Sequence, residues 1–173
     1  MSAALPRFFS RALRRTWLAA LALLLIGCVQ PRNIAPGTSG DEVLRSLGAP
    51  TARYPVLAGG ERLQYSSQPV GQTVYNIDLG PDGRVLRVQQ VLDESLFAQR
   101  IQPDVWTRAD VLREYGPPAR TMGVHNFNGV IWVWRYLSGV TWRLLFINVD
   151  PAGVVRGWSN GDEDLPEPRR GRR

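Results

Sequence analysis

The sequence predicts an α+β fold of two tandem helix-plus-antiparallel-sheet units, which form a two-layer domain with the helices on one face. Two repeated blocks lead to this prediction. Residues 39–50 align with residues 107–118 and share Val-Leu-Arg, a glycine and a final proline. Residues 75–85 align with residues 145–155, and a Pro-x-Gly sequence recurs at the same place in both. Two blocks repeated in the same order indicate two copies of a unit of about 70 residues.

Each unit is expected to begin with a helix. Ser39 and Thr107 are favourable N-cap residues. Glu42 and Asp110 stand three residues later and complete a capping-box pattern, in which glutamate is the better match. The apolar residues that follow lie on one face of each helix: Val43, Leu44 and Leu47 in the first, and Val111, Leu112 and Tyr115 in the second. Both helices are about two turns long, so they need a sheet beneath them to be stable.

The helices are expected to end at glycines and to be followed by strands. Gly48 and Gly116 suit the left-handed conformation that commonly ends a helix, and the prolines after them exclude continuation. Alternating apolar residues then predict the strands, with turn sequences between them. These strands are residues 72–79 and 84–91 in the first unit, and residues 130–137, 140–148 and 154–158 in the second. Ser138-Gly139 is a two-residue hairpin signal between two of them.

One face of this predicted hairpin is a candidate protein-binding surface. Pairing Leu137 with Val140 places Trp132, Trp134, Tyr136 and Arg143 on one face, with Trp134 and Arg143 as neighbours. Tryptophan, tyrosine and arginine are enriched at binding hot spots. The opposite face, with Ile131, Val133, Arg135 and Leu137 across from Val140, Trp142, Leu144 and Phe146, is expected to pack on the helices. The alternative is that the aromatic residues are core. Five of the six tryptophans lie beyond residue 100, which favours a binding role for the second unit.

The composition excludes several kinds of functional site. The chain has one histidine and one cysteine, and all 21 of its basic residues are arginine. A histidine- or cysteine-built metal site needs three or four ligands, a disulfide needs two cysteines, and Schiff-base or P-loop chemistry needs a lysine. The single histidine, His125, is expected in a loop, because no nucleophile-elbow sequence accompanies it. We therefore predict no catalytic residues, no metal or other cofactor, and no enzymatic activity.

The net charge of +6 comes from the two ends of the chain. Four arginines precede residue 16, and Arg169, Arg170, Arg172 and Arg173 close the sequence. The arginines between are spread out and nearly balanced by acids, which argues against nucleic-acid binding. Residues 161–173 have no apolar periodicity and are expected to be a disordered tail. The four tail arginines are candidate contacts to anionic lipid head groups, with a merely solvated end as the alternative.

The N-terminal sequence indicates export followed by lipid anchoring. Residues 1–27 combine arginines with a ten-residue apolar run, about 15 Å as a helix and too short to span a bilayer, which is typical of a signal peptide. Leu25-Ile26-Gly27-Cys28 is similar to the lipobox of bacterial lipoproteins. That resemblance implies cleavage before Cys28, acylation of Cys28 with palmitate-type chains, and, with valine next, an outer-membrane anchor facing the periplasm. A soluble secreted protein with an incidental cysteine is the alternative, and the export route stays open between the general and twin-arginine systems.

The predicted organisation resembles a known lipoprotein family. Residues 28–36 are expected to be anchor and linker, residues 37–100 the first unit and residues 101–160 the second. The pattern Ile34-x-x-Gly37-x-Ser39-x-x-x-Val43-x-x-x-Leu47-Gly48-x-Pro50, followed by an aromatic strand and a Pro-x-Gly hairpin, is similar to the BamE/SmpA/OmlA family. Val105 takes the place of Gly37 in the second copy. The two-unit arrangement also resembles the secreted β-lactamase-inhibitor proteins.

These resemblances imply two functions, both of them non-enzymatic. The first is a scaffold or accessory binding module in envelope biogenesis, acting in outer-membrane β-barrel assembly with the assembly machine as partner. The second is a periplasmic inhibitor or sensor that binds a soluble envelope enzyme through the sheet of the tandem units. The first family usually has one unit rather than two, and its Gln-Gly-Asn stretch before the helix is absent here.

Overall fold

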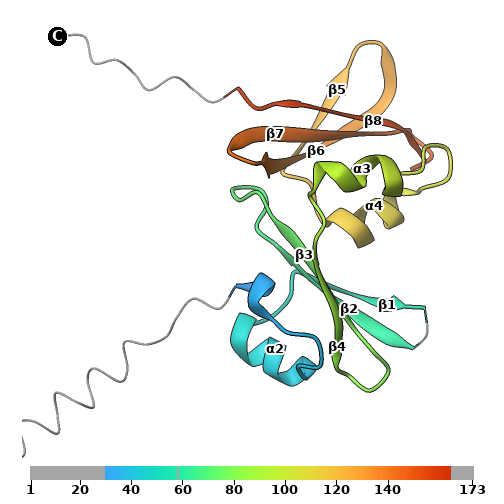
Figure 1. The fold of residues 1–173 in the computed structure, drawn as a ribbon. Helices are drawn as coiled ribbons and strands as arrows, with labels where there is room; N and C mark the ends of the chain where they lie inside the picture. The colour runs from blue at the N-terminus through green and yellow to red at the C-terminus, as the bar shows by residue number, and fades with distance from the viewer. Residues whose placement is uncertain (1–29, 58, 165–173) are drawn as a thin grey trace, which may run out of the picture.

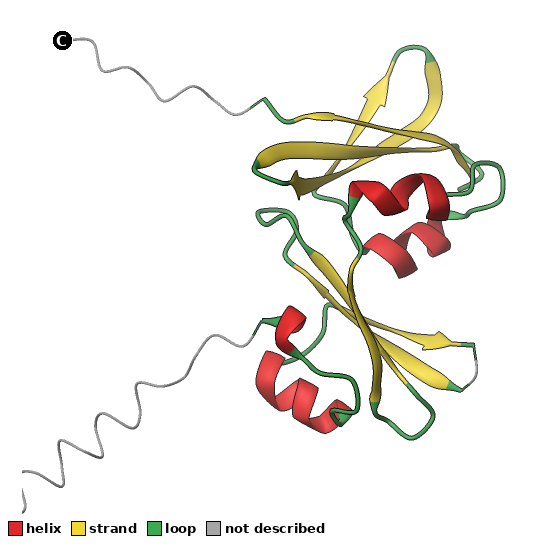
Figure 2. Ribbon diagram, in the orientation of Figure 1, coloured by secondary structure: helices red, strands yellow, loops and turns green. Residues whose placement is uncertain are grey.

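The computed structural model describes residues 30–57 and 59–164 of the 173-residue chain. Cys28 and the four tail arginines, Arg169, Arg170, Arg172 and Arg173, lie outside the described residues, as does the signal sequence. The described residues form two four-stranded antiparallel sheets, three α-helices and one 3-10 helix (Figures 1 and 2). The predicted α+β class is therefore confirmed.

In each sheet the strands pair in sequence order. The first half of the chain contains η1 (Pro31–Asn33), α2 (Gly40–Leu47), β1 (Ala52–Val56), β2 (Gly60–Ser66), β3 (Val74–Leu79) and β4 (Val85–Gln90). The second contains α3 (Glu94–Arg100), α4 (Arg108–Tyr115), β5 (Arg120–Val124), β6 (Phe127–Ser138), β7 (Thr141–Val149) and β8 (Val155–Asp162). None of the described helices is long and apolar enough to cross a membrane.

The helix caps form largely as predicted. Ser39 Oγ accepts from the backbone N–H of Glu42 at 3.3 Å. Thr107 donates its backbone N–H and its hydroxyl to Asp110 Oδ2, at 2.8 and 2.7 Å. The aspartate thus makes the return bond to the N-cap, although its side chain is one carbon shorter than that of glutamate.

The same backbone contacts recur in both halves of the chain. The first helical N–H donates to a turn glycine in each half: Gly40 to Gly83 at 2.8 Å, and Arg108 to Gly153 at 2.7 Å. Shortly before each helix a residue with positive φ donates to the last strand. Gly37 donates to Val85 and Asp104 to Val155, each at 2.7 Å. The counterpart of Gly37 is therefore Asp104 and not the expected Val105, because the second segment has one extra residue before its helix.

Helices cover one face of each sheet, and the end of α4 contacts part of a third face. Helix α2 packs Val43 on Leu63 and Ile77 of the first sheet. Helices α3 and α4 pack on one face of the second sheet, where Phe97 and Tyr115 join a core that also contains Trp134, Tyr136, Leu145 and Ile147. The same two helices lie between the two sheets (Figure 1), and the C-terminal end of α4 contacts the first sheet. Helices thus contact both faces of the first sheet, which differs from the expected two-layer domain.

The physical reason for this arrangement is that α4 ends against side-chain amides of the first sheet. The last carbonyls of a helix have no partner within it. Gln64 Nε2 donates to the carbonyls of Leu112 and Arg113 at 3.3 and 3.2 Å, and Asn76 Nδ2 donates to that of Glu114 at 2.9 Å. Both amide side chains are buried. The polar side chains Gln64 on β2 and Asn76 on β3 therefore face the end of α4 and not water.

A chain of ion pairs surrounds these amides. Arg62 pairs with Asp78 at 2.7 Å and with Glu114 at 2.9 Å, and all three side chains are nearly buried. Arg87 also pairs with Asp78, at 2.6 Å, and Arg100 pairs with Glu114. The two halves of the protein are therefore joined by charged as well as neutral hydrogen bonds, which keep otherwise costly buried carboxylates compensated.

This network predicts an acid-sensitive contribution to stability. Burial acts to raise the pKa of Asp78, but hydrogen bonds and charges from Arg62 and Arg87 outweigh it, so the pKa lies below its ordinary value. A carboxyl with a lowered folded-state pKa stabilises the protein above its unfolded pKa, about 3.9, and this stabilisation is lost as the pH falls through the folded pKa. We expect Asp78→Asn to reduce the loss of stability seen between pH 5 and pH 2 in urea unfolding. Asp41→Asn, at an exposed site on α2, is the control, and an unchanged profile for Asp78→Asn would contradict the prediction.

Candidate functional site: the outer face of the second sheet

The predicted aromatic surface lies in the core. Trp134 and Tyr136 have no exposed surface, and Trp132 packs against the same cluster. Arg143 donates from Nε to the Tyr136 hydroxyl at 3.1 Å and pairs with Asp162 at 3.1 Å. Trp134 and Tyr136 therefore cannot form the exposed binding surface that the sequence predicted. The physical reason is that α3 and α4 present aromatic side chains of their own, such as Phe97, and cover this face.

The observed hairpin register differs from the predicted one, yet each face of the hairpin carries the residues that the sequence predicted for it. The turn is Gly139-Val140, so Ser138 pairs with Thr141, and Gly139 alone of the two turn residues has a positive φ. Relative to the expected Ser138-Gly139 turn, the pairing is shifted by two residues. A two-residue shift leaves every side chain on its original face. The predicted neighbours do change: Trp134 lies opposite Leu145, and Arg143 lies opposite Tyr136.

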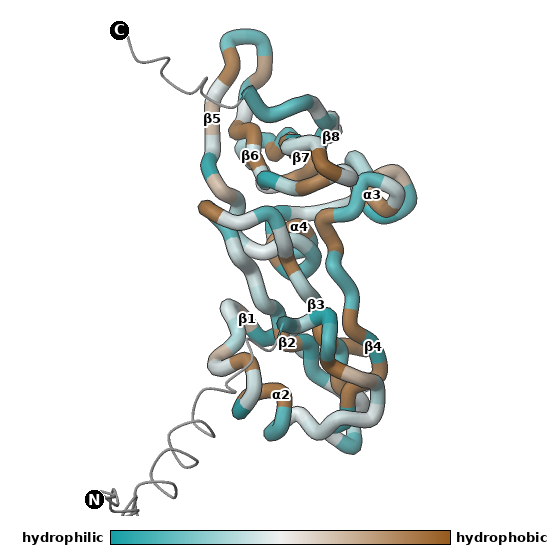
Figure 3. Tube along the Cα trace, turned by 60° about the vertical axis from the view of Figure 1, so that its left-hand side comes forward, coloured by the Kyte–Doolittle hydropathy of each residue, from teal (hydrophilic) through white to brown (hydrophobic). Residues whose placement is uncertain are grey.

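We define the outer face as the face of β5–β8 directed away from α3 and α4, and it contains the residues expected to pack on helices. Hydrophobic residues are frequent in β6 and β7 (Figure 3). The outer-face residues of β5 to β7 are Arg120, Met122, Val124, Phe127, Ile131, Val133, Arg135, Leu137, Trp142, Leu144, Phe146 and Asn148. On β8 the outer-face residues Gly157, Ser159 and Gly161 are small. Met122 is 39 % exposed and Leu137 43 %, whereas Val133 and Leu144 in the middle of the face are buried, so the outer face is open to solvent in part.

Two hollows lie on the outer face. The apolar hollow has a volume of about 560 Å³. It is lined by Met122, Val124, Asn126, Phe127, Ile131, Phe146, Asn148 and Ser159. Because β8 contributes only a small side chain here, the ring of Phe146 borders open space on that side. The hollow can accept large apolar side chains of a partner without any movement of the sheet.

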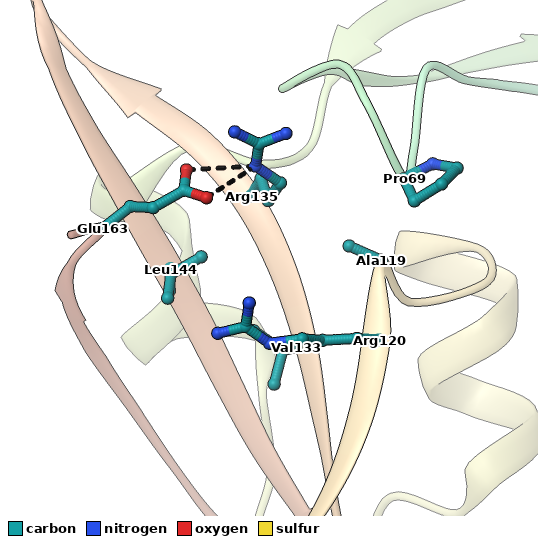
Figure 4. A pocket seen from close by; sticks show the side chains of 7 residues that line it. All are labelled: Pro69, Ala119, Arg120, Val133, Arg135, Leu144 and Glu163. Carbon is teal, nitrogen blue, oxygen red and sulfur yellow. Dashed lines mark hydrogen bonds and ion pairs between the residues drawn. The ribbon is translucent and has the colours of Figure 1, made fainter. Parts of the chain in front are cut away.

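The arginine hollow, of about 300 Å³, lies farther along the same strands (Figure 4). It is lined by Pro69, Ala119, Arg120, Val133, Arg135, Leu144 and Glu163. Arg135 Nε contacts both carboxylate oxygens of Glu163, at 2.8 and 3.0 Å, and its guanidinium lies over the Trp142 ring at 5.1 Å. Arg120 is exposed, and among the described residues no carboxylate forms an ion pair with it.

The loop between β2 and β3 holds one end of this hollow in place. Gln68 donates from Nε2 to the carbonyl of Arg135 at 2.8 Å and accepts from its backbone N–H at 3.3 Å. Arg135 NH1 also donates to the carbonyl of Val70 at 3.0 Å. The Gln68 amide thus takes the place of a neighbouring strand where β5 has not yet begun. The first half of the chain therefore contributes directly to the site, and no short-range sequence pattern could have indicated this contact.

His125 and Asp93 do not line either hollow. His125 is exposed in the turn between β5 and β6, as expected of a loop histidine. Asp93 accepts from the backbone N–H of Ser95 at 3.0 Å and caps α3. Within residues 30–57 and 59–164, no three histidine, cysteine, aspartate or glutamate side chains are grouped as metal ligands. The chemistry available on the outer face is therefore apolar contact together with charge pairing.

Comparison with known proteins adds little. No family model matches the chain, and no curated protein matches it. Among solved structures, the chain is similar to YjgB from Bacillus subtilis, described as a DUF4309 family protein. The identity is 16 % and the TM-score is 0.30, with 72 % of this chain and 78 % of that chain covered. A similarity at that level carries no argument about function.

Proposed function

We propose that this protein is a lipid-anchored, non-enzymatic binding module of the outer membrane, and that the outer face of its second sheet contacts a protein partner in the bacterial envelope. The uncovered outer face is the observation that carries this proposal. Helices pack on one face of each sheet, and the end of α4 contacts the other face of the first sheet. The outer face is directed away from α3 and α4, and Met122 and Leu137 meet solvent there. Contiguous exposed apolar surface commonly marks an interaction site.

The lipobox sequence supports the anchored location. Cys28 precedes the first described residue, Gln30, by two positions, and η1 begins at Pro31. Three extended residues span at most about 11 Å, so acyl chains on Cys28 would hold the first half of the protein close to the membrane surface. A membrane-tethered partner would then be met at high local concentration.

The β-barrel assembly machine is the partner class that we propose first. The recurring contacts at Ser39 and Thr107, and the repeated order of helix and four-stranded sheet, support two copies of one unit in tandem. The sequence resemblance around Gly37 and Ser39 is what suggests BamE-like units. In this proposal the second unit uses its sheet for binding, and the first unit positions it through Gln68. A soluble periplasmic enzyme bound by the same face is the competing outcome of the experiment below.

A pull-down from gently solubilised envelopes tests the proposal. The full lipidated chain is compared with Cys28→Ala, which lacks the anchor, and with Met122→Asp, which places a charge on the outer face. Leu86→Asp is the matched control, because Leu86 is 64 % exposed on the first sheet. We expect the wild type and Leu86→Asp to recover assembly-machine subunits. Met122→Asp should recover at least tenfold less of these subunits, and Cys28→Ala should recover a reduced amount. Equal recovery by Met122→Asp would exclude the outer face, and recovery of one soluble enzyme without the lipid would favour the inhibitor or sensor function.

A further inference from the structure

We propose that the outer face binds an amphipathic helix of its partner, whose apolar side chains fill the apolar hollow and whose carboxylate pairs with Arg120. This inference rests on the proposed function and specifies the chemistry of the partner. It follows from the shape of the outer face, from its charge, and from the way this protein covers its other sheet faces.

The two hollows are adjacent along β6 and β7, and we call them together the groove. Ile131 and Phe146 line the apolar hollow, and Val133 and Leu144 line the arginine hollow. On each strand these residues are two positions apart, so they are neighbours on the same face. From Phe127 to Arg135 the groove follows nine residues of β6, which span about 27 Å of extended strand. That length accommodates a helix of several turns at 1.5 Å per residue.

One positive charge in the groove is left for a partner. Arg135 is already bound by Glu163, by the carbonyl of Val70 and by the Trp142 ring. Arg120 lines the same hollow, and its side chain extends over the floor formed by Val133 (Figure 4). The hollow therefore contains two guanidinium groups and one carboxylate. A guanidinium group presents a planar fork of donors that suits a carboxylate, so an acidic residue is the complement at this end.

Charge argues against two other occupants. Residues 165–173 contain one glutamate, Glu167, and four arginines, Arg169, Arg170, Arg172 and Arg173, so Arg120 would repel their net positive charge. A second copy of the protein would present an outer face with the same excess of positive charge. A helix is favoured over a strand because short helices supply the apolar layer on the covered face of each sheet, α2 on the first and α3 with α4 on the second. The occupant is then the missing helical layer of the second sheet, supplied from outside.

Binding of two designed peptides to the full chain carrying Cys28→Ala tests this inference. Both probes are fluorescein-labelled 14-residue helices with leucines on one face, flanked by glutamates in one peptide and by lysines in the other. We expect anisotropy titrations to show at least tenfold tighter binding of the glutamate peptide, with a difference that shrinks as salt is raised. Arg120→Glu should abolish or reverse the preference. Arg45→Glu, an exposed arginine on α2, should leave it unchanged.

Several results would overturn the inference. Equal affinity for the two peptides, or a preference that survives Arg120→Glu, would remove the role of Arg120. Tighter binding after truncation at Asp164 would show that the tail occupies the groove, and a sedimenting dimer that Met122→Asp dissociates would show a second copy there. Failure of this inference can be distinguished from failure of the proposed function. Recovery of the envelope partner that is lost in Met122→Asp but normal in Arg120→Glu would keep the function and reject the acidic helix.

Discussion

Trp134→Ala is expected to lower the free energy of unfolding by about 3–5 kcal/mol, the range for removing a buried aromatic side chain and leaving a cavity. Trp134 has no exposed surface. Its ring lies 5.9 Å from Tyr115 and 6.0 Å from Trp132, and its Nε1–H donates to the carbonyl of Gly116 at 3.3 Å. The substitution removes contacts to α4 and to the sheet together, so neither side alone can close the cavity.

Urea unfolding followed by circular dichroism measures this loss, with Trp142→Ala as the matched control. Trp142 is half-buried on the outer face, beneath Arg135. Its truncation to alanine removes mainly a cation–π contact of about 0.5–1 kcal/mol. We expect the two variants to differ by at least about 2 kcal/mol, and only Trp142→Ala to change binding at the outer face. A Trp134→Ala protein as stable as the wild type would instead place the aromatic face in solvent.

Gly116→Ala is expected to destabilise the protein more than Gly48→Ala, although the two glycines end equivalent helices. Gly48 has φ +77° and ψ −163°, and Gly116 has φ +68° and ψ −171°. This region is adopted almost only by glycine and costs other residues about 1–3 kcal/mol. A Cβ on Gly48 would meet nothing within 4 Å, whereas a Cβ on Gly116 would lie 2.8 Å from Gln64 Oε1. Gly116→Ala therefore adds displacement of a buried amide to the backbone strain.

The difference in unfolding free energy between these two variants measures the contribution of the contact between Gln64 and the end of α4. Displacing Gln64 withdraws its donor from the end of α4, and a buried polar group left unpaired costs about 1–3 kcal/mol. We expect Gly116→Ala to exceed Gly48→Ala by about that amount in thermal or urea unfolding. In a Gln64→Ala background, Gly116→Ala should cost only about as much as Gly48→Ala, because the clash is removed and the donor is already absent. Equal effects for the two single variants would show that the amide does not hold α4.

Sequence analysis predicted correctly those helices and strands whose apolar residues recur on one face. The caps at Ser39 and Thr107, and the strands β3, β4, β6 and β7, were found within a few residues. Strand β8 begins as predicted but continues to Asp162, and Glu163 pairs with Arg135, so the disordered tail expected from residue 161 was placed too early. The glycines after both helices do have positive φ, but with extended ψ and not the expected left-handed value.

The elements that were missed depend on contacts outside themselves. Strand β2 carries Arg62 and Gln64 at alternate positions, and both face α4 instead of water. Strand β1 contains Pro55, β5 contains Gly123, and α3 has only seven residues, with Asp93 as its cap and Phe97 as its buried anchor. Asp93 at the N-cap was the local signal that could have located α3.

The sequence by itself determined the class of fold, the capped helices and the division of the second hairpin into two chemically different faces. A period of two residues separates those faces, and it survives the two-residue shift of the turn to Gly139-Val140. Only the tertiary structure decided which face is covered. Both faces are rich in apolar residues, so periodicity cannot rank them. The choice depends on the aromatic side chains of α3 and α4 and on the anchoring of α4 by Gln64 and Asn76, which are distant in sequence.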